Sequence, residues 1–363
     1  MTRSAPVPPV KLARLVERAR HHLLRVHQRT VPPYAAMMDM LMNAWAAQAI
    51  TAAVDLGIAD ALADGPVGAE ELAARVNADA DALRRLLRVL IGRGIFRQRR
   101  DGRYQLNSFA DTLRRNAPKS VAGLASLYGS REHREHWSHL AEAIRTGKAV
   151  IPALHGSDAF EYLSSEPELT KVFNRAMAET TEMTVPFLLA VYPFDAYPTV
   201  VDVGGGVGRL LAAILAATPT AHGVLYDLPQ AVAEAPALLR QHGIADRVRV
   251  DEGSFFEAVP TGGDIYVLKM IIHDWPEDQA IEILRNVRAA AEVGTTLLLI
   301  ETVIPDHNRD HVGNWTSLEM LLMNAGRERT AAEYRALLHR AGFQVTRVVP
   351  TASPFSLVEA KAI

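Results

Sequence analysis

The spacing of apolar residues predicts helices throughout the first third of the chain. Residues 11–28 are amphipathic and strongly basic, and Pro32 and Pro33 separate them from the next helical segment. That segment, residues 37–63, carries more apolar side chains than a helix with one buried face requires. A subunit interface or a large internal core would bury them, and the sequence leaves both open.

A winged-helix pattern follows these helices. Short helices are predicted over residues 68–76 and 79–90, and residues 94–107 are predicted to form a hairpin with Asp101-Gly102 at its turn. Because winged helices often bind DNA, a transcriptional regulator is an alternative function. Arginines on the hairpin favour it, whereas acidic residues near both helices and the formal net charge of −2 argue against it.

The rest of the chain changes from helical to alternating strands and helices. Residues 121–191 are predicted to be helical, with breaks at Gly147, Pro152, Gly156 and Pro167. Short β-rich runs then occupy residues 199–203, 222–227, 247–250, 264–269, 296–302, 343–349 and 355–360. Most of these runs are separated by helical stretches, which predicts an α/β fold with a parallel sheet and helices on both faces.

A chain of 363 residues is long enough for two domains. We place their boundary near residue 115, where the winged-helix pattern has ended. Residues 1–115 then form the helical domain, and residues 116–363 form the sheet domain, which includes connecting helices over residues 116–195.

Composition narrows the function to small-molecule chemistry. The chain has no cysteine, which excludes disulfides, cysteine-ligated zinc and thiol catalysis. A net charge of −2 gives no overall attraction to nucleic acid or to an anionic membrane. Neither a signal peptide nor an apolar stretch of membrane-spanning length is visible, so we expect a cytoplasmic protein.

A glycine loop marks the first strand–helix junction of the predicted sheet. Residues 199–203 run directly into the Gly204–Gly208 loop, where the backbone lets a ligand approach closely. Arg209 occupies the third glycine position of the dinucleotide fingerprint, and no Walker lysine follows. Asp227 ends the next strand, where a carboxylate matches the vicinal hydroxyls of a ribose. Asp227 could instead cap the next helix, but together with Asp202 the loop favours a nucleoside without a pyrophosphate.

Five motifs occur in the order known from one enzyme family. They are VDVGGGVGR, YDLP, GSFF, LKMIIHDW and NAGRERT. In these motifs and over nearly its whole length the chain resembles the plant-type small-molecule O-methyltransferases and their bacterial relatives from aromatic natural-product pathways. The resemblance implies a Rossmann-like class I methyltransferase sheet with an N-terminal winged-helix domain that forms a homodimer.

The resemblance also implies that the loop holds S-adenosyl-L-methionine, which leaves as S-adenosyl-L-homocysteine. The matching positions are Asp202, Gly204, Gly206, Gly208, Asp227, Leu228, Ser254, Phe255 and Lys269. Phe255 can pack against the adenine ring. Ser254 stands where the family usually has Asp, and its hydroxyl accepts a hydrogen bond from the adenine amine more weakly than a carboxylate would.

His273 matches the general base of the family. A phenol with a pKa near 10 can lose its proton to an imidazole as the sulfonium methyl is attacked, and this route requires no metal. Asp274 or Glu301 would orient the imidazole, and Glu328 is expected beside it. An ordinary strand-end histidine and solvated loop glutamates are the alternatives. The segment before Glu328 is one residue shorter than in plant members.

An apolar pocket for a flat acceptor is implied by the same resemblance. Its predicted lining is Phe173, Asn174, Met177, Trp275, Met320, Met323 and Asn324. Thioethers adapt well to planar rings, although helical Met and Phe side chains often serve only as core. The expected acceptor is a hydroxylated aromatic or quinone-type small molecule. A relative that binds the cofactor but performs hydroxylation or decarboxylation is the second alternative function.

Three histidines that lie close together in the sequence could at first suggest a metal site. His133, His136 and His139 follow one another at spacings of three, but no carboxylate completes a metal-binding helix motif. We therefore interpret them as part of a partly exposed helix face and predict no metal in this protein.

Overall fold

The computed structural model describes residues 7–363, which form two compact units. The helical unit consists of Arg20–Ser138 and Leu163–Met183. The sheet unit consists of the described residues up to Ala19, His139–Tyr162 and Thr184–Ile363. The boundary near residue 115 stays a prediction. No helix among the described residues is both long and apolar enough to cross a membrane.

The helical unit is built from short helices around one long helix. Its elements are α1 (Val10–Gln28, from Arg20 on), α2 (Pro33–Asp55), α3 (Ile58–Ala61), α4 (Ala69–Arg75), α5 (Ala80–Gly92), β1 (Arg97–Gln98), β2 (Tyr104–Gln105), α6 (Ser108–Asp111), α7 (Ala122–Gly129), α8 (Arg131–Ser138) and the first part of α12 (Pro167–Leu189). The apolar segment that follows Pro33 thus forms two helices, because Gly57 adopts a positive φ of 67° between them.

The winged-helix motif has the predicted elements. Helices α4 and α5 are followed by a hairpin in which Arg97 of β1 lies opposite Gln105 of β2. Asp79 caps α5, since its Oδ1 accepts a hydrogen bond from the N–H of Ala82 at 2.8 Å. Gly102 has a φ of 83° in the turn, as a tight hairpin requires.

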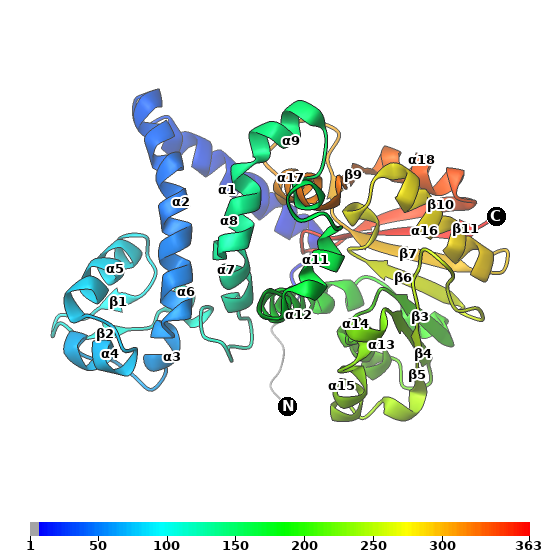
Figure 1. Cartoon of the computed structure of the whole chain (residues 1–363), viewed down its shortest axis with the longest axis horizontal. Helices are drawn as coiled ribbons and strands as arrows, with labels where there is room; N and C mark the ends of the chain where they lie inside the picture. The colour runs from blue at the N-terminus through cyan, green and yellow to red at the C-terminus, as the bar shows by residue number, and fades with distance from the viewer. Residues whose placement is uncertain (1–6) are drawn as a thin grey trace. The chain divides into compact units, whose positions relative to one another are not determined.

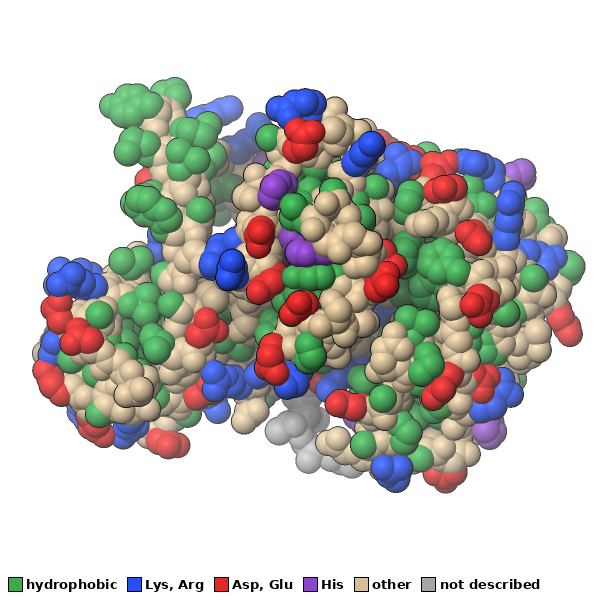
Figure 2. Space-filling model, viewed as in Figure 1, with side chains coloured by type: hydrophobic (Ala, Val, Ile, Leu, Met, Phe, Trp, Pro, Cys, Tyr) green, Lys and Arg blue, Asp and Glu red, His purple; other side chains and the backbone are tan. Residues whose placement is uncertain are grey.

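Helix α2 exposes much of its apolar surface. Met38, Leu41 and Trp45 are 63%, 67% and 71% exposed, whereas Ala53 and Val54 near its end are buried in the core of the helical unit. Figure 2 shows hydrophobic side chains gathered over this helix. The large internal core proposed from the sequence is therefore wrong for the first half of α2, which leaves a subunit interface as its means of burial.

The sheet unit contains a seven-stranded sheet in the order β10-β11-β7-β6-β3-β4-β5. The strands are β3 (Thr199–Val203), β4 (His222–Asp227), β5 (Val248–Glu252), β6 (Ile265–Lys269), β7 (Thr296–Glu301), β10 (Phe343–Pro350) and β11 (Ser356–Ala362). Strands β3 to β7 pair in parallel, but β11 is antiparallel to both β7 and β10. A fully parallel sheet was thus wrong at this end, because β10 and β11 are joined by a short turn without a crossover helix.

Helices cover both faces of this sheet (Figure 1). They are α13 (Arg209–Ala217), α14 (Pro229–Val232), α15 (Ala235–Gln241), α16 (Glu277–Ala290) and α18 (Ala331–Arg340), whereas α17 (Val312–Asn324) packs against α10 (Val150–His155) and the 3₁₀ turn after β6. Successive strand residues alternate between two cores: Val201 and Leu268 pack with α16 and α18, whereas Val200 and Val267 pack with α13 and α15. Both faces are therefore buried, which leaves the strand ends for polar groups.

Short helices precede the sheet within this unit. They are α9 (Leu140–Thr146), α10 (Val150–His155) and the start of α11 (Ala159–Ser165). Gly147 and Gly156 end α9 and α10 with positive φ angles, and Pro167 begins α12, as predicted. The expected break at Pro152 is wrong: this proline is the third residue of α10, where the backbone N–H has no helical partner to lose.

Candidate active site

The glycine loop between β3 and α13 is tightly packed on one side and open on the other. Gly204, Gly206 and Gly208 all have positive φ angles, of 70°, 56° and 83°. A Cβ atom on Gly204 would lie 2.5 Å from Cδ1 of Ile271, which would have to move, and the positive φ disfavours any other residue there. Nothing lies within 4 Å of a Cβ atom placed on Gly206. A ligand can therefore approach the backbone at Gly206.

Asp227 at the end of β4 is bound to this loop. Its Oδ2 accepts a hydrogen bond from the N–H of Gly206 at 2.7 Å, and its Oδ1 accepts one from the N–H of Leu228 at 2.7 Å. Burial raises the pKa of Asp227, and these two N–H groups lower it. The carboxylate thus contacts the glycine loop and the residue before α14, and its binding of a ribose stays a prediction. Each carboxylate oxygen keeps a lone pair for a ribose hydroxyl.

A buried acid and a buried base lie behind the loop. Asp202 at the end of β3 is 1% exposed, and within the described residues its Oδ2 has no hydrogen-bond partner. Burial raises its pKa to about 7, although the charge of Lys269 acts in the opposite direction. Burial lowers the pKa of Lys269 to about 8. A buried, unsatisfied carboxylate oxygen favours a ligand that brings a donor, and the amino-acid part of S-adenosyl-L-methionine carries one.

Two aromatic side chains stand beside the same loop. Cε1 of Phe255 would lie 3.6 Å from a Cβ atom on Gly204, and the rings of Phe255 and Trp275 are 6.2 Å apart at 77°. Ser254 uses its Oγ to accept a hydrogen bond from the N–H of Phe256 at 3.2 Å. The loop, Asp227 and Phe255 thus fit a nucleoside with an aromatic base, while the hydroxyl of Ser254 is engaged within its own turn.

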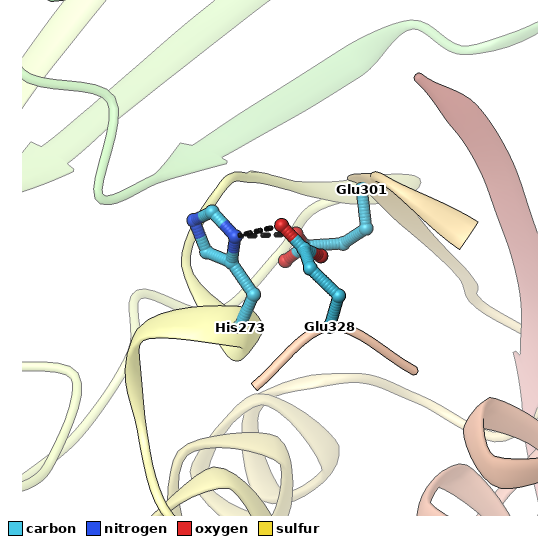
Figure 3. Close-up of side chains that lie close together, drawn as sticks. All are labelled: His273, Glu301 and Glu328. Carbon is cyan, nitrogen blue, oxygen red and sulfur yellow. Dashed lines mark hydrogen bonds and ion pairs between the residues drawn. The ribbon is translucent and has the colours of Figure 1, made fainter. Parts of the chain in front are cut away.

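His273 lies among three buried carboxylates, and Figure 3 shows it with two of them, Glu301 and Glu328. It belongs to the 3₁₀ turn η3 (Ile272–Asp274) that follows β6. Nδ1 of His273 is 2.9 Å from Oε1 of Glu328 and 3.9 Å from Oε2 of Glu301, and Nε2 is 3.3 Å from Oδ1 of Asp274. We call these four residues the histidine cluster. The alternative that Glu301 and Glu328 are solvated loop residues is wrong, because they are 0% and 2% exposed.

Burial and neighbouring charges shift the pKa values in the histidine cluster. Burial by itself lowers the pKa of His273, but Asp274, Glu301 and Glu328 together raise it to about 10. Burial raises the pKa of Asp274 to about 6 and that of Glu301 to about 7, against the opposing effect of His273. The imidazole is therefore protonated at neutral pH and is about as basic as a phenolate.

Each carboxylate has a different structural role. Oε1 of Glu301, at the end of β7, accepts hydrogen bonds from the N–H groups of Ile271 and Ile272 at 3.2 and 2.9 Å, which fixes the turn before His273. Glu328 is the carboxylate in hydrogen-bond contact with Nδ1. In the neutral imidazole this contact selects the tautomer with a proton on Nδ1, so that Nε2 is the basic nitrogen.

The structure adds two polar groups that sequence reasoning missed. Thr316 on α17 donates a hydrogen bond from Oγ1 to Oε1 of Glu328 at 2.7 Å. The guanidinium of Arg329 is buried behind the turn that carries His273. Nothing in the spacing of Thr316 indicates its contact, whereas Arg329 lay within a motif already singled out. The capping box of Thr330 and Glu333 is confirmed.

Four of the predicted acceptor residues lie in the sheet unit, and three lie in the helical unit. Trp275 and Asn324 are buried and line a cavity of about 410 Å³ in the sheet unit. Met320 and Met323 are buried in one small apolar cluster with residues of α10 and α11. The remaining three, Phe173, Asn174 and Met177, lie on α12 in the helical unit, and their contact with an acceptor stays a prediction.

One group of side chains has the geometry of a metal site. Ligand atoms of His273, Glu301 and Glu328 all lie within 4.8 Å of one another, and among residues 7–363 no other group of three meets this condition. The His133, His136 and His139 trio is therefore not such a group. The expectation of metal-free chemistry at the histidine cluster stays a prediction.

Comparison with known proteins identifies the family. The O-methyltransferase domain family matches residues 137–344, and the O-methyltransferase dimerisation domain family matches residues 38–116. The phenazine O-methyltransferase of Lysobacter antibioticus is 37% identical to this chain, and the alignment covers 92% of this chain and 97% of that protein. The chain belongs to the O-methyltransferase family. The winged-helix region of this O-methyltransferase lies within the match to a dimerisation domain, which favours association of protein chains over DNA binding.

Two solved structures have the same architecture. The mitomycin 7-O-methyltransferase superposes with a TM-score of 0.84 at 34% identity, covering 91% of this chain and 98% of its own. An O-methyltransferase of neocarzinostatin biosynthesis, solved with S-adenosylmethionine and 2-hydroxy-5-methyl naphthoic acid, has a TM-score of 0.75 at 34% identity and covers 88% and 96%. The chain is thus a class I methyltransferase with an additional helical dimerisation domain.

Proposed function

We propose that this O-methyltransferase transfers the methyl group of S-adenosyl-L-methionine to a hydroxyl of a small aromatic or quinone-type acceptor. The observation that carries the proposal is the placement of His273 next to the glycine loop. Ile271, two residues before His273, packs against Gly204, so the proton acceptor and the cofactor loop share one end of the sheet. Functional groups of such sheets gather at this end.

The cofactor is held by groups that suit each of its parts. Asp227 accepts from the ribose hydroxyls, Phe255 packs against the adenine, and the open backbone at Gly206 lets the ligand lie close. The free Oδ2 of Asp202 can accept from the ammonium of the methionine part, with Lys269 nearby in the same buried region. When bound, the cofactor supplies a methyl group on a positively charged sulfur.

His273 removes the acceptor's proton through Nε2. With Nδ1–H donating to Glu328, Nε2 is the nitrogen that can accept the proton of a phenol. After transfer the imidazolium is stabilised by Glu328 on one side and by Asp274, 3.3 Å from Nε2, on the other. Because the pKa of His273 is about 10, like that of a simple phenol, the proton transfer is nearly balanced in free energy.

Only a small fraction of the protein has an unprotonated His273 at neutral pH. A pKa of about 10 leaves roughly one site in a thousand unprotonated at pH 7. Activity towards a simple phenol should therefore rise about tenfold per pH unit between pH 7 and 9. Acceptors that bind already ionised, such as hydroxyquinones, meet the imidazolium directly and should lack this rise.

The exposed apolar face of α2 supports a homodimer. Met38, Leu41 and Trp45 lie within the segment that matches a dimerisation domain, and all three are exposed in the single chain. Exposed aromatic and methionine side chains of this kind are enriched in subunit interfaces. Sedimentation of the purified protein tests this part, with a Trp45→Glu variant expected to sediment as a monomer.

A panel of phenols, naphthols and hydroxyquinones with methyl-labelled cofactor tests the proposed reaction. We expect labelled product and S-adenosyl-L-homocysteine in equal amounts, and no change of rate with a metal chelator. His273→Ala should lose most activity towards phenols while it still binds S-adenosyl-L-homocysteine. Full activity of this variant would refute the base, and a product formed without S-adenosyl-L-homocysteine would favour hydroxylation or decarboxylation.

A further inference from the structure

Arg329 is a buried guanidinium directly behind the histidine cluster. It is 1% exposed and is among the largest fully buried side chains of the chain. Its Nη1 donates to the backbone carbonyl of Ile272 at 3.0 Å and to that of Arg327 at 3.2 Å. Its Nη2 donates to the carbonyl of Trp275 at 3.4 Å. The carbonyls of Ile272 and Trp275 enclose His273 and Asp274, so one side chain spans the turn that presents the imidazole.

The backbone of Arg329 also connects the two glutamates of the cluster. Arg329 follows Glu328 in the chain and pairs with Val303 where β8 (Val303–Ile304) meets β9 (Arg329–Thr330). Val303 comes two residues after Glu301. Arg329 therefore holds the His273 turn through its side chain, while its backbone joins the segments that carry the two glutamates.

Gly326 brings the same segment close to the turn. A Cβ atom at this position would collide with the backbone carbonyl of His273 and with the carbonyl carbon of Asp274. The loop before Arg329 thus lies in direct contact with the backbone of the turn. Such close packing lets Glu328 reach Nδ1 of His273 from a separate segment.

Arg329 also carries a fixed positive charge in this buried region. Three carboxylates surround one imidazole, so the fully ionised cluster has two more negative than positive charges. A guanidinium stays protonated at every pH at which proteins are folded. Its charge helps to lower the pKa of Glu333 on α18 and acts on the buried hydroxyl of Tyr334. Tyr334 on α18 is also buried near these carboxylates and Arg329.

We propose that Arg329 is a positioning residue for methyl transfer, and that it fixes His273 against Glu328 through the backbone of its turn. The proposal rests on the proposed function, since it assigns the source of precision at that same site. Arginine suits this task because its planar fork reaches carbonyls three residues apart. A lysine keeps the charge but offers a single ammonium, which cannot span both carbonyls.

Two substitutions separate the hydrogen bonds from the charge. Arg329→Met removes both, and Arg329→Lys retains the charge alone. We expect kcat to fall about 100-fold in Arg329→Met, because small displacements of a catalytic group have effects of this size. The KM for S-adenosyl-L-methionine should stay within about twofold of the wild-type value, since the glycine loop and Asp227 are unchanged. Arg327→Met, in the same loop but about half exposed, is the matched control and should behave like wild type.

The ionisation of His273 gives a readout that general loss of stability would not move. If Arg329 holds His273 against Glu328, Arg329→Met weakens this contact and should lower the pKa of His273, because Glu328 is among the carboxylates that raise it. Arg329→Lys cannot span both carbonyls, so it should leave this pKa low and recover kcat by no more than about tenfold. The pKa is measured from the NMR signals of labelled histidine, assigned by comparison with His273→Gln.

The outcomes distinguish this inference from the proposed function. A folded Arg329→Met with wild-type kcat and wild-type His273 titration would overturn the positioning role. If Arg329→Met does not fold, Arg329→Lys decides: full kcat refutes the spanning hydrogen bonds, and low kcat with a lowered pKa of His273 supports them. Because the NMR titration needs no acceptor, it still tests Arg329 if the wild-type protein methylates none of the acceptors offered.

Discussion

Glu328→Gln is the substitution that most directly tests how the histidine cluster works. Glutamine keeps the size of the side chain and an oxygen that can accept from Nδ1 of His273 and from Oγ1 of Thr316. It removes only the negative charge 2.9 Å from the ring. The substitution therefore asks how much of the basicity of His273 comes from this one carboxylate.

Coulomb's law sets the size of the effect. With an effective dielectric constant of about 20, a charge 2.9 Å away stabilises the imidazolium by about 6 kcal/mol, and one 3.9 Å away by about 4 kcal/mol. The first figure corresponds to at most about four pKa units. We therefore expect the pKa of His273 to fall from about 10 towards the ordinary value of histidine in Glu328→Gln, and by less in Glu301→Gln.

The assay is the pH dependence of kcat for a simple phenol. A less basic imidazole is a weaker general base, and a less well oriented one, so kcat at high pH should fall about 100-fold or more. Near pH 7 His273 is unprotonated in a larger fraction of the variant than of the wild type. The ratio of wild-type to variant kcat should therefore be at least about tenfold smaller there than at high pH. Glu277→Gln, at a half-exposed carboxylate on α16, is the control and should leave the profile unchanged.

The reasoning would be refuted if Glu328→Gln lowered kcat by the same factor at all pH values. Such a result would mean that Glu328 affects only the orientation of the ring and not its proton affinity. An unchanged profile in a folded Glu328→Gln protein would remove Glu328 from the mechanism altogether.

Three further substitutions have clear expected outcomes. Gly326→Ala forces a methyl group against the backbone at His273, so urea denaturation should show a loss of about 1–3 kcal/mol together with reduced kcat; unchanged stability would mean that the loop moves freely. Asp227→Asn removes the charge that accepts from Gly206, and calorimetry should show about 10- to 100-fold weaker binding of S-adenosyl-L-homocysteine with unchanged melting of the helical unit; equal affinity would exclude a ribose contact. Leu87→Ala in the fully buried core of the helical unit should lower the free energy of unfolding by about 2–5 kcal/mol, and a loss below 1 kcal/mol would contradict the packing described.

Much of the fold could be predicted because local signals were strong. The hairpin at Gly102, the ends of helices at Gly147 and Gly156, and every strand of the large sheet follow from turn residues and periodicity. The antiparallel direction of β10 and β11 could not be predicted from alternation alone. It depends on which strands become neighbours, a non-local property that hydrophobic periodicity does not contain.

The sequence named the members of the histidine cluster but did not predict their geometry. The motifs contained His273 and Glu328, and the resemblance added Glu301, but the contact of Glu328 with Nδ1 depends on a loop that approaches the turn at Gly326. No sequence spacing encodes an approach between segments about 50 residues apart. For the same reason the sequence could not show that Arg329 spans the turn around His273.

The strand order also has a consequence for how the protein is made. Strand β11 is the last strand in sequence, yet it lies between β7 and β10 in the sheet. During synthesis β10 leaves the ribosome first but has no partner until β11 has emerged and paired with Leu297 to Ile300 of β7. This edge of the domain therefore completes its hydrogen bonds after translation has passed residue 362. A chain that ended before β11 would leave β7 and β10 with unpaired edges.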